Sequence, residues 1–121
     1  MFQLFRLGGD AFKARSAERD AETDRARVLS VLTAIDGALQ ASKDEHSGLS
    51  TRIDEVLARA AVTVGLASDE YLDREPHLSH HLSLFDAEIA SGQRRLQELS
   101  TMIDYLRSMK AELLSRFPEL R

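Results

Sequence analysis

Residues 78–106 read LSHHLSLFDAEIASGQRRLQELSTMIDYL, and large apolar side chains return there every three or four positions. One heptad position holds Leu78, Phe85, Gly92, Leu99, Leu106, Leu113 and Leu120. Its partner position holds Leu82, Ile89, Leu96, Ile103, Lys110 and Phe117. Such a repeat is typical of a coiled-coil helix, which packs one apolar stripe against another helix. The pattern predicts a long helix over 76–117, because Pro76 suits a helix start and Pro118 ends the run.

The segment before this helix predicts two further helices. Over 11–45, a weaker stripe recurs every seven residues at Ala14, Ala21, Val28 and Ile35, with Ala17, Val31 and Ala38 between them. His46, Ser47 and Gly48 then favour a tight hairpin, because glycine closes helices readily and serine caps them. A short helix over 51–64 would follow, with one face formed by Ile53, Val56, Leu57, Ala60 and Val64. Residues 66–75 are predicted to be a linker.

The resulting fold class is all-α, an elongated helical bundle or coiled coil of two long helices and one short helix in an up-down-up order. We expect one helical domain over 10–121, preceded by a flexible apolar segment over 1–9 that ends in the bend-favouring Gly8 and Gly9. The short helix cannot cover the apolar stripes of both long helices. A homo-oligomer is therefore expected.

Composition narrows the class of protein. The chain has 121 residues, a net charge of -4 and no cysteine, and charges of both signs are interleaved along the predicted helices. This distribution offers no basic face for nucleic acid and no thiolate chemistry. No apolar run reaches membrane-spanning length, so a cytoplasmic location is expected. Thirteen arginines against three lysines suggest a bacterial, GC-rich source.

Two groups of apolar residues are candidate partner-binding sites. The first is the long-helix stripe, represented by Leu96, Leu99, Ile103, Leu106 and the polar exception Lys110. Met102, Met109 and Leu114 widen this stripe, which favours core packing and leaves a partner groove as the alternative. The second is the N-terminal segment with Phe2, Leu4, Phe5 and Leu7. It would pack on the chain's own bundle or dock on a protein, and a membrane is less favoured because Arg6 is its only basic residue.

One histidine cluster suggests metal binding as an alternative. His77 and His81 would share a helix face one turn apart, with acidic residues on both sides. Two imidazoles and a carboxylate can bind zinc or a similar metal. The favoured interpretation is a solvated helix start, and no cofactor is expected.

These patterns favour a non-enzymatic coiled-coil interaction module, acting as an adaptor, a small chaperone or a structural component of a bacterial assembly. The sequence shows no nucleophile elbow, phosphate loop or metalloprotease motif. The alternatives are a peripheral membrane factor that uses the N-terminal segment and a metal-binding or metal-sensing protein that uses the histidines.

Overall fold

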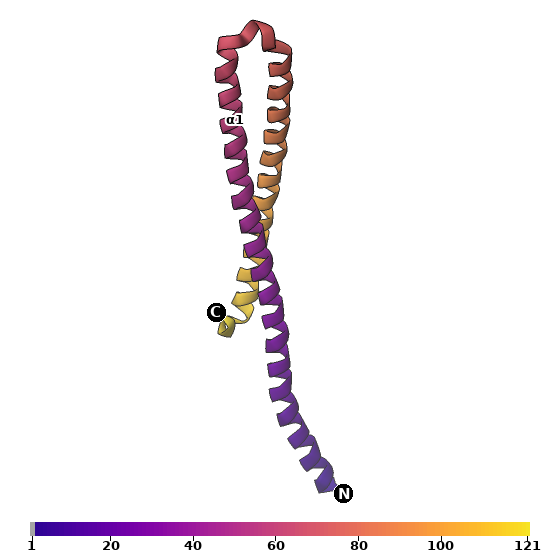
Figure 1. The fold of residues 1–121 in the computed structure, drawn as a ribbon. Helices are drawn as coiled ribbons and strands as arrows, with labels where there is room; N and C mark the ends of the chain where they lie inside the picture. Colours follow the sequence, from indigo (N-terminus) through magenta and orange to yellow (C-terminus); the bar gives the residue numbers. More distant parts are fainter. Residues whose placement is uncertain (1) are drawn as a thin grey trace. The chain divides into compact units, whose positions relative to one another are not determined.

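In the computed structural model the chain is helical, with α1 over Phe2–Arg116 and the short 3-10 helix η1 over Pro118–Leu120 (Figure 1). The structure describes the backbone from residue 2 and the side chains of residues 16–65 and 80–121. No strand occurs in this described part. The predicted all-α class is therefore confirmed.

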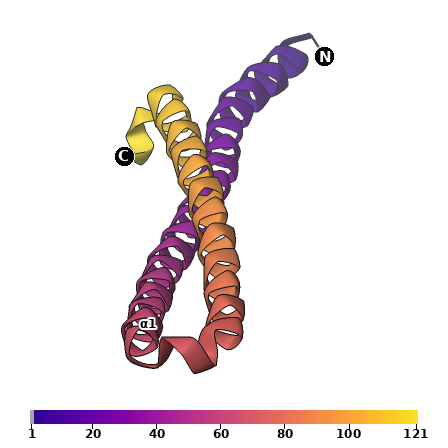
Figure 2. The same cartoon turned by 90° about the horizontal axis from the view of Figure 1, so that it is seen from above.

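The contacts divide the chain into two compact units, one over 38–108 and one formed by 1–37 with 109–121. Within the larger unit, Glu45 contacts Arg95 and Ile53 lies against Gly92. These contacts between distant residues show that α1 reverses direction between residues 65 and 80. We call residues 38–65 the first arm and residues 80–108 the second arm. Figures 1 and 2 show these arms side by side and antiparallel.

The larger unit is held together by one seam in which both arms keep a seven-residue repeat. The first arm contributes Leu39, Ser42, His46, Leu49, Ile53, Val56, Ala60 and Thr63, all buried or half-buried. The second arm contributes Leu82, Phe85, Ile89, Gly92, Leu96, Leu99, Ile103 and Leu106. The stripe predicted for the second arm is thus the stripe that packs. Val56 and Leu99 are the most completely buried, with 1% and 2% of their surface exposed.

The predicted hairpin over 46–50 is wrong, because α1 continues through these residues. The seam positions Ser42, His46, Leu49 and Ile53 stay in phase across them, so a continuous helix keeps the same face on the second arm. No described glycine has a positive φ, and Gly48 therefore does not terminate a helix. Consequently the short helix over 51–64 is not a separate element. The predicted up-down-up order is wrong for the larger unit, in which the reversal expected at 46–50 is absent and the chain turns between residues 65 and 80 (Figure 1).

The packed face predicted for the helices over 11–45 and 51–64 is also corrected. The repeat uses Leu32 and Leu39 as partners of Ile35, and each of these is at most 8% exposed. Val31, which was expected in that role, is 49% exposed. Leu57 and Val64 were expected on the packed face further along, and they too are about half exposed. The packed residue after Val28 is Leu32, four positions on, instead of Val31, three positions on. Leu57 and Val64 each lie one residue beyond a packed position, Val56 and Thr63.

The smaller unit has its own contacts. Leu32 and Ile35 are buried, and the Lys110 ammonium lies 2.8 Å from an Asp36 carboxylate oxygen. The N–H of Phe117 donates to the carbonyl of Leu113 at the end of α1. The predicted flexible segment over 1–9 lies where side chains are not described, and it stays a prediction. The predicted linker over 66–75 and the predicted helix start at Pro76 are wrong as helix boundaries, because α1 continues through both.

Gly92 is the point of closest approach in the larger unit. A Cβ placed on it would lie 2.8 Å from Cδ1 and 2.9 Å from Cγ1 of Ile53. These distances are shorter than van der Waals contact, so a side chain at this position would displace Ile53. The glycine in the second-arm stripe is therefore the partner of a large residue in the first arm.

Candidate interaction surface

The predicted partner-binding residues of the stripe lie inside the larger unit. Leu99, Ile103 and Leu106 are at most 8% exposed, and Leu96 is half-buried. Leu39 of the first arm packs with Ile103 and Leu106 in one buried cluster. Their apolar surface is used to hold the two arms together.

Lys110 belongs to the smaller unit, where Asp36 is its ion-pair partner. The side chains are 37% and 47% exposed, so solvent screens the pair and it contributes at most about 1 kcal/mol to stability. A lysine at a stripe position is therefore accommodated by its ion pair with Asp36 and by its own outward reach.

Two predicted sites fall wholly or partly outside the described side chains. The side chains that the structure does not describe include those of Phe2, Leu4, Phe5, Leu7 and His77. The roles predicted for these residues stay predictions. His81 is described and exposed, with its ring centre 6.2 Å from that of His80. Among residues 16–65 and 80–121 no group of three or more metal-ligating side chains comes together. The same residues contain no helical stretch of sufficient length and apolarity to cross a membrane.

One side of the larger unit carries an apolar groove of about 610 Å³ between the arms. Its lining from the first arm is Ala38, Ala41, Ser42 and Glu45, and from the second arm Arg95, Glu98, Leu99, Met102 and Leu106. We call this the alanine groove. Met102 is 48% exposed, and Tyr105, one turn further along the same side of the helix, is 61% exposed.

The groove exists because residue sizes differ between the arms. Ala38 and Ala41 are too small to cover the seam, while Met102 projects from the opposite arm. The sequence indicated that Met102 widens the stripe and left core packing or a partner groove as alternatives. In the larger unit it lines a groove that is open to solvent. The sequence placed Ala38 on the packed stripe and did not mark Ala41, but both are exposed and line the groove. Their role could not be predicted because it depends on what lies across the seam.

Charged side chains flank the groove at one end. The Arg95 guanidinium donates from Nε and Nη2 to the two carboxylate oxygens of Glu45, at 2.7 and 3.0 Å. This bidentate hydrogen bonding, more than charge alone, lowers the pKa of Glu45 and raises the pKa of Arg95. Glu98 also contacts Arg95, at 3.6 Å. Both residues of the main pair are about half exposed, so the pair contributes mainly to register and orientation.

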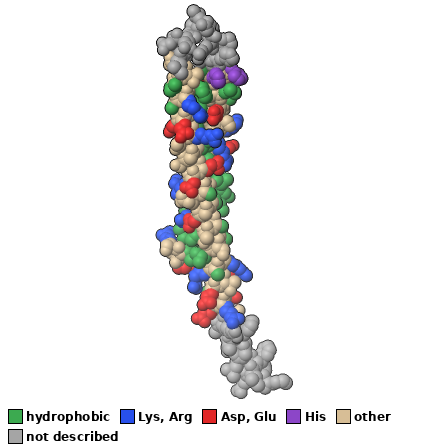
Figure 3. Space-filling model, in the orientation of Figure 1, with side chains coloured by type: hydrophobic (Ala, Val, Ile, Leu, Met, Phe, Trp, Pro, Cys, Tyr) green, Lys and Arg blue, Asp and Glu red, His purple; other side chains and the backbone are tan. Residues whose placement is uncertain are grey.

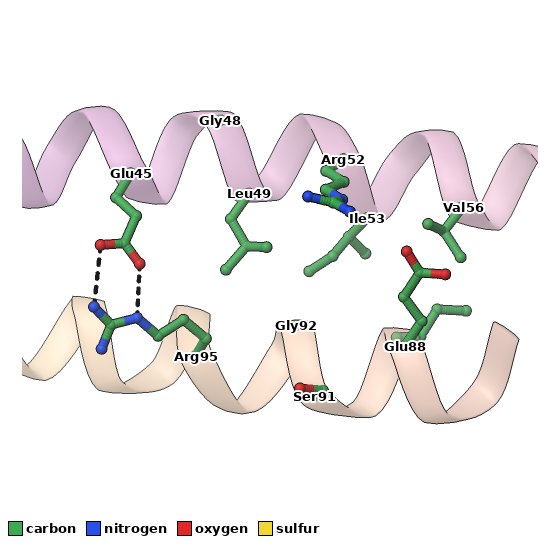
Figure 4. Close-up of a pocket in the computed structure, with 11 residues that line it drawn as sticks. Glu45, Gly48, Leu49, Arg52, Ile53, Val56, Glu88, Ser91, Gly92 and Arg95 are labelled. Carbon is green, nitrogen blue, oxygen red and sulfur yellow. Dashed lines mark hydrogen bonds and ion pairs between the residues drawn. The ribbon is translucent and has the colours of Figure 1, made fainter. Parts of the chain in front are cut away.

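A second hollow, of about 630 Å³, continues along the same side toward the chain reversal (Figure 4). It forms because Gly48, Ser91 and Gly92 carry little or no side chain. Arg52 comes from the first arm and Glu88 from the second, so charges of opposite sign face the same hollow. Figure 3 shows the wider pattern, in which acidic and basic side chains are interspersed over the visible face.

On the other side of the seam, two polar side chains contact each other between the arms. His46 Nε2 lies 3.4 Å from the hydroxyl of Ser100, and both side chains are half-buried. Lys43 and Arg107 line a smaller recess of about 310 Å³ beside them. The two sides of the larger unit therefore differ, since one carries the apolar groove and the other this polar recess.

The fold and this surface define the molecule as an all-helical protein whose larger unit is an antiparallel coiled-coil hairpin. No family model, no curated protein and no solved structure matches the chain.

Proposed function

We propose that this protein is a non-enzymatic coiled-coil interaction module, of the adaptor, chaperone or structural-component kind, that binds protein through the alanine groove. The observation that carries the proposal is the partly exposed Met102 over an apolar groove whose floor includes Leu99 and Leu106. Aromatic side chains and methionine are enriched at protein interfaces, so the nearby Tyr105 supports the same surface.

The form of the groove supports a helical partner. It is lined by residues of both arms, and an amphipathic helix can place side chains spaced three and four residues apart in a groove between two helices. Its charged end, with Glu45, Arg95 and Glu98, provides polar contacts at the rim. The apolar floor would supply affinity and the charged rim orientation. We place the module in a bacterial cytoplasm, which the lack of cysteine and the arginine bias favour.

The test is a binding comparison between two variants that add the same charge. Met102→Glu places a carboxylate in the groove, whereas Gln93→Glu places one at an exposed position on the other side of the second arm. Each tagged variant is cross-linked in cells of the source organism, and the partners are quantified by mass spectrometry. We expect specific partners to be lost with Met102→Glu and retained with Gln93→Glu. Equal retention by both variants would refute the groove as the binding surface.

A further inference from the structure

We infer that the alanine groove is filled by a second copy of this chain, related by a two-fold axis parallel to the arms. This inference rests on the proposed function, since it names the partner for the same groove. Such an axis keeps every residue at its level along the arms and places the first arm of one copy against the second arm of the other. Two hairpins joined in this way form a four-helix bundle.

Residue size is the first argument. The small groove residues Ala38 and Ala41 lie on the first arm, and the large Met102 lies on the second. The proposed axis sets the alanines of each copy opposite Met102 and Tyr105 of the other, so projections enter recesses in both directions. A two-fold axis perpendicular to the arms would instead place like arms together, with large side chains against large ones.

Charge is the second argument. Within one chain Glu45 already bonds Arg95 across the seam, and Arg52 and Glu88 lie across the neighbouring hollow. Because the proposed axis preserves levels, Glu45 of one copy meets Arg95 of the other with the same offset along the arms. Arg52 and Glu88 are matched in the same way. Opposite charges thus meet between copies as they do within one, which favours this orientation.

The exposed side chains at the groove are the third argument. Met102 and Tyr105 are 48% and 61% exposed beside a groove of about 610 Å³. The core of a stable interface is apolar, and an interface of standard size buries ~800 Å² of each partner. A second copy laid along the groove would cover these side chains in both chains at once.

The first measurement is the mass in solution, by light scattering and sedimentation at several protein concentrations. Two copies are expected for the wild type and for Gln93→Glu, with at least a tenfold weaker dimer for Met102→Glu. Tyr105→Ser tests the same contact without adding charge, and its side chain is 61% exposed, so folding should survive. Circular dichroism confirms the helicity of each variant. A monomeric wild type, or dimers unaffected by both groove variants, would overturn the inference.

The second measurement is disulfide trapping, which has no background because the chain lacks cysteine. An Ala41→Cys copy is mixed with a differently tagged Met102→Cys copy, so that any disulfide between the tags joins two chains. We expect this pair to oxidise rapidly. The control pair is Lys43→Cys with Arg107→Cys, on the polar recess, and it should not link. Preferential linking of the control pair, or of Met102→Cys with itself, would contradict the proposed axis.

The two proposals fail in different ways. A monomer that still loses its partners with Met102→Glu would refute the second copy and leave the groove as a binding surface for another protein. If the wild type is a monomer and Met102→Glu retains the same cross-linked partners, both proposals are refuted.

Discussion

Replacing Gly92 with alanine tests whether the packing at the closest approach of the arms controls stability. The new Cβ would lie 2.8 and 2.9 Å from two carbons of Ile53, and 3.8 Å from Cδ1 of Leu49. Ile53 is only 8% exposed and β-branched, so it has little freedom to move aside. The arms must separate locally, or Ile53 must leave its preferred rotamer.

The magnitude follows from two opposing effects. Glycine to alanine inside a helix is favourable by about 1 kcal/mol, because glycine loses more backbone freedom on folding. Overpacking a filled core position is unfavourable by about 1 to 3 kcal/mol. We therefore expect Gly92→Ala to lie between no change and about 2 kcal/mol of lost stability. Gly48→Ala is the matched control, since nothing lies within 4 Å of a Cβ there, and it should gain about 0.5 to 1 kcal/mol.

Urea unfolding followed by circular dichroism measures both variants, and the difference between their midpoints isolates the steric effect. A third variant, Ile53→Val, removes one of the two crowded carbons, and in that background Gly92→Ala should be less destabilising. If Gly92→Ala raised stability as much as Gly48→Ala, the close packing of Gly92 against Ile53 would be refuted.

Three further predictions concern the seam of the larger unit and one ion pair in each unit. Leu99→Asp, at a position 2% exposed, buries an unpaired carboxylate and should abolish most helicity in circular dichroism; an unchanged spectrum would contradict its place in the seam. Lys110→Leu replaces a screened ion pair with Asp36 by apolar contact and should raise the melting temperature by a few degrees, whereas a lower value would show that the ion pair matters more. Glu45 has a pKa below its ordinary 4.5 because Arg95 hydrogen-bonds its carboxylate, so its stabilising contribution is complete above pH 4.5 and is lost as the pH falls through the lowered pKa. The stability difference between wild type and Glu45→Gln should therefore shrink below pH 4.5 in acid titrations of urea unfolding, and a constant difference would contradict the pairing.

In the second arm, the local spacing of apolar residues is enough to predict the packed face. Its large residues, from Leu82 to Leu106, recur with one spacing and leave one helical face able to bury them. The predicted stripe is the packed stripe for this reason. The predicted stop at Pro118 also agrees with α1, which ends at Arg116.

The first arm shows where local pattern is insufficient. Polar residues, Ser42 and His46, occupy two successive seam positions, and they interrupt the apolar repeat just before Gly48. A break in apolar character beside a glycine is a reasonable hairpin signal. It is overruled because keeping the helix straight through Gly48 loses only about 1 kcal/mol relative to alanine. Burial of Ile53 and Val56 against the second arm, at about 1.5 to 3 kcal/mol for each side chain, exceeds that loss.

The candidate groove, too, could be predicted only in part from the sequence. That Met102 lies beside the stripe can be read from its spacing, but its partial exposure depends on what the first arm sets opposite it. Small residues there, Ala38 and Ala41, leave the groove open, and larger ones would have closed it. Neither arm contains that information alone.

By itself the sequence determined that this chain is all-helical and which face of the second arm is apolar, because helix formation and stripe spacing depend on neighbours within a few residues. Only the tertiary structure decided where the chain reverses, which face of the first arm is buried and which surface remains open. Those outcomes depend on pairing residues some fifty positions apart, as Glu45 pairs with Arg95. The favoured register is the one in which such distant side chains fit together, with Ile53 filling the space left by Gly92.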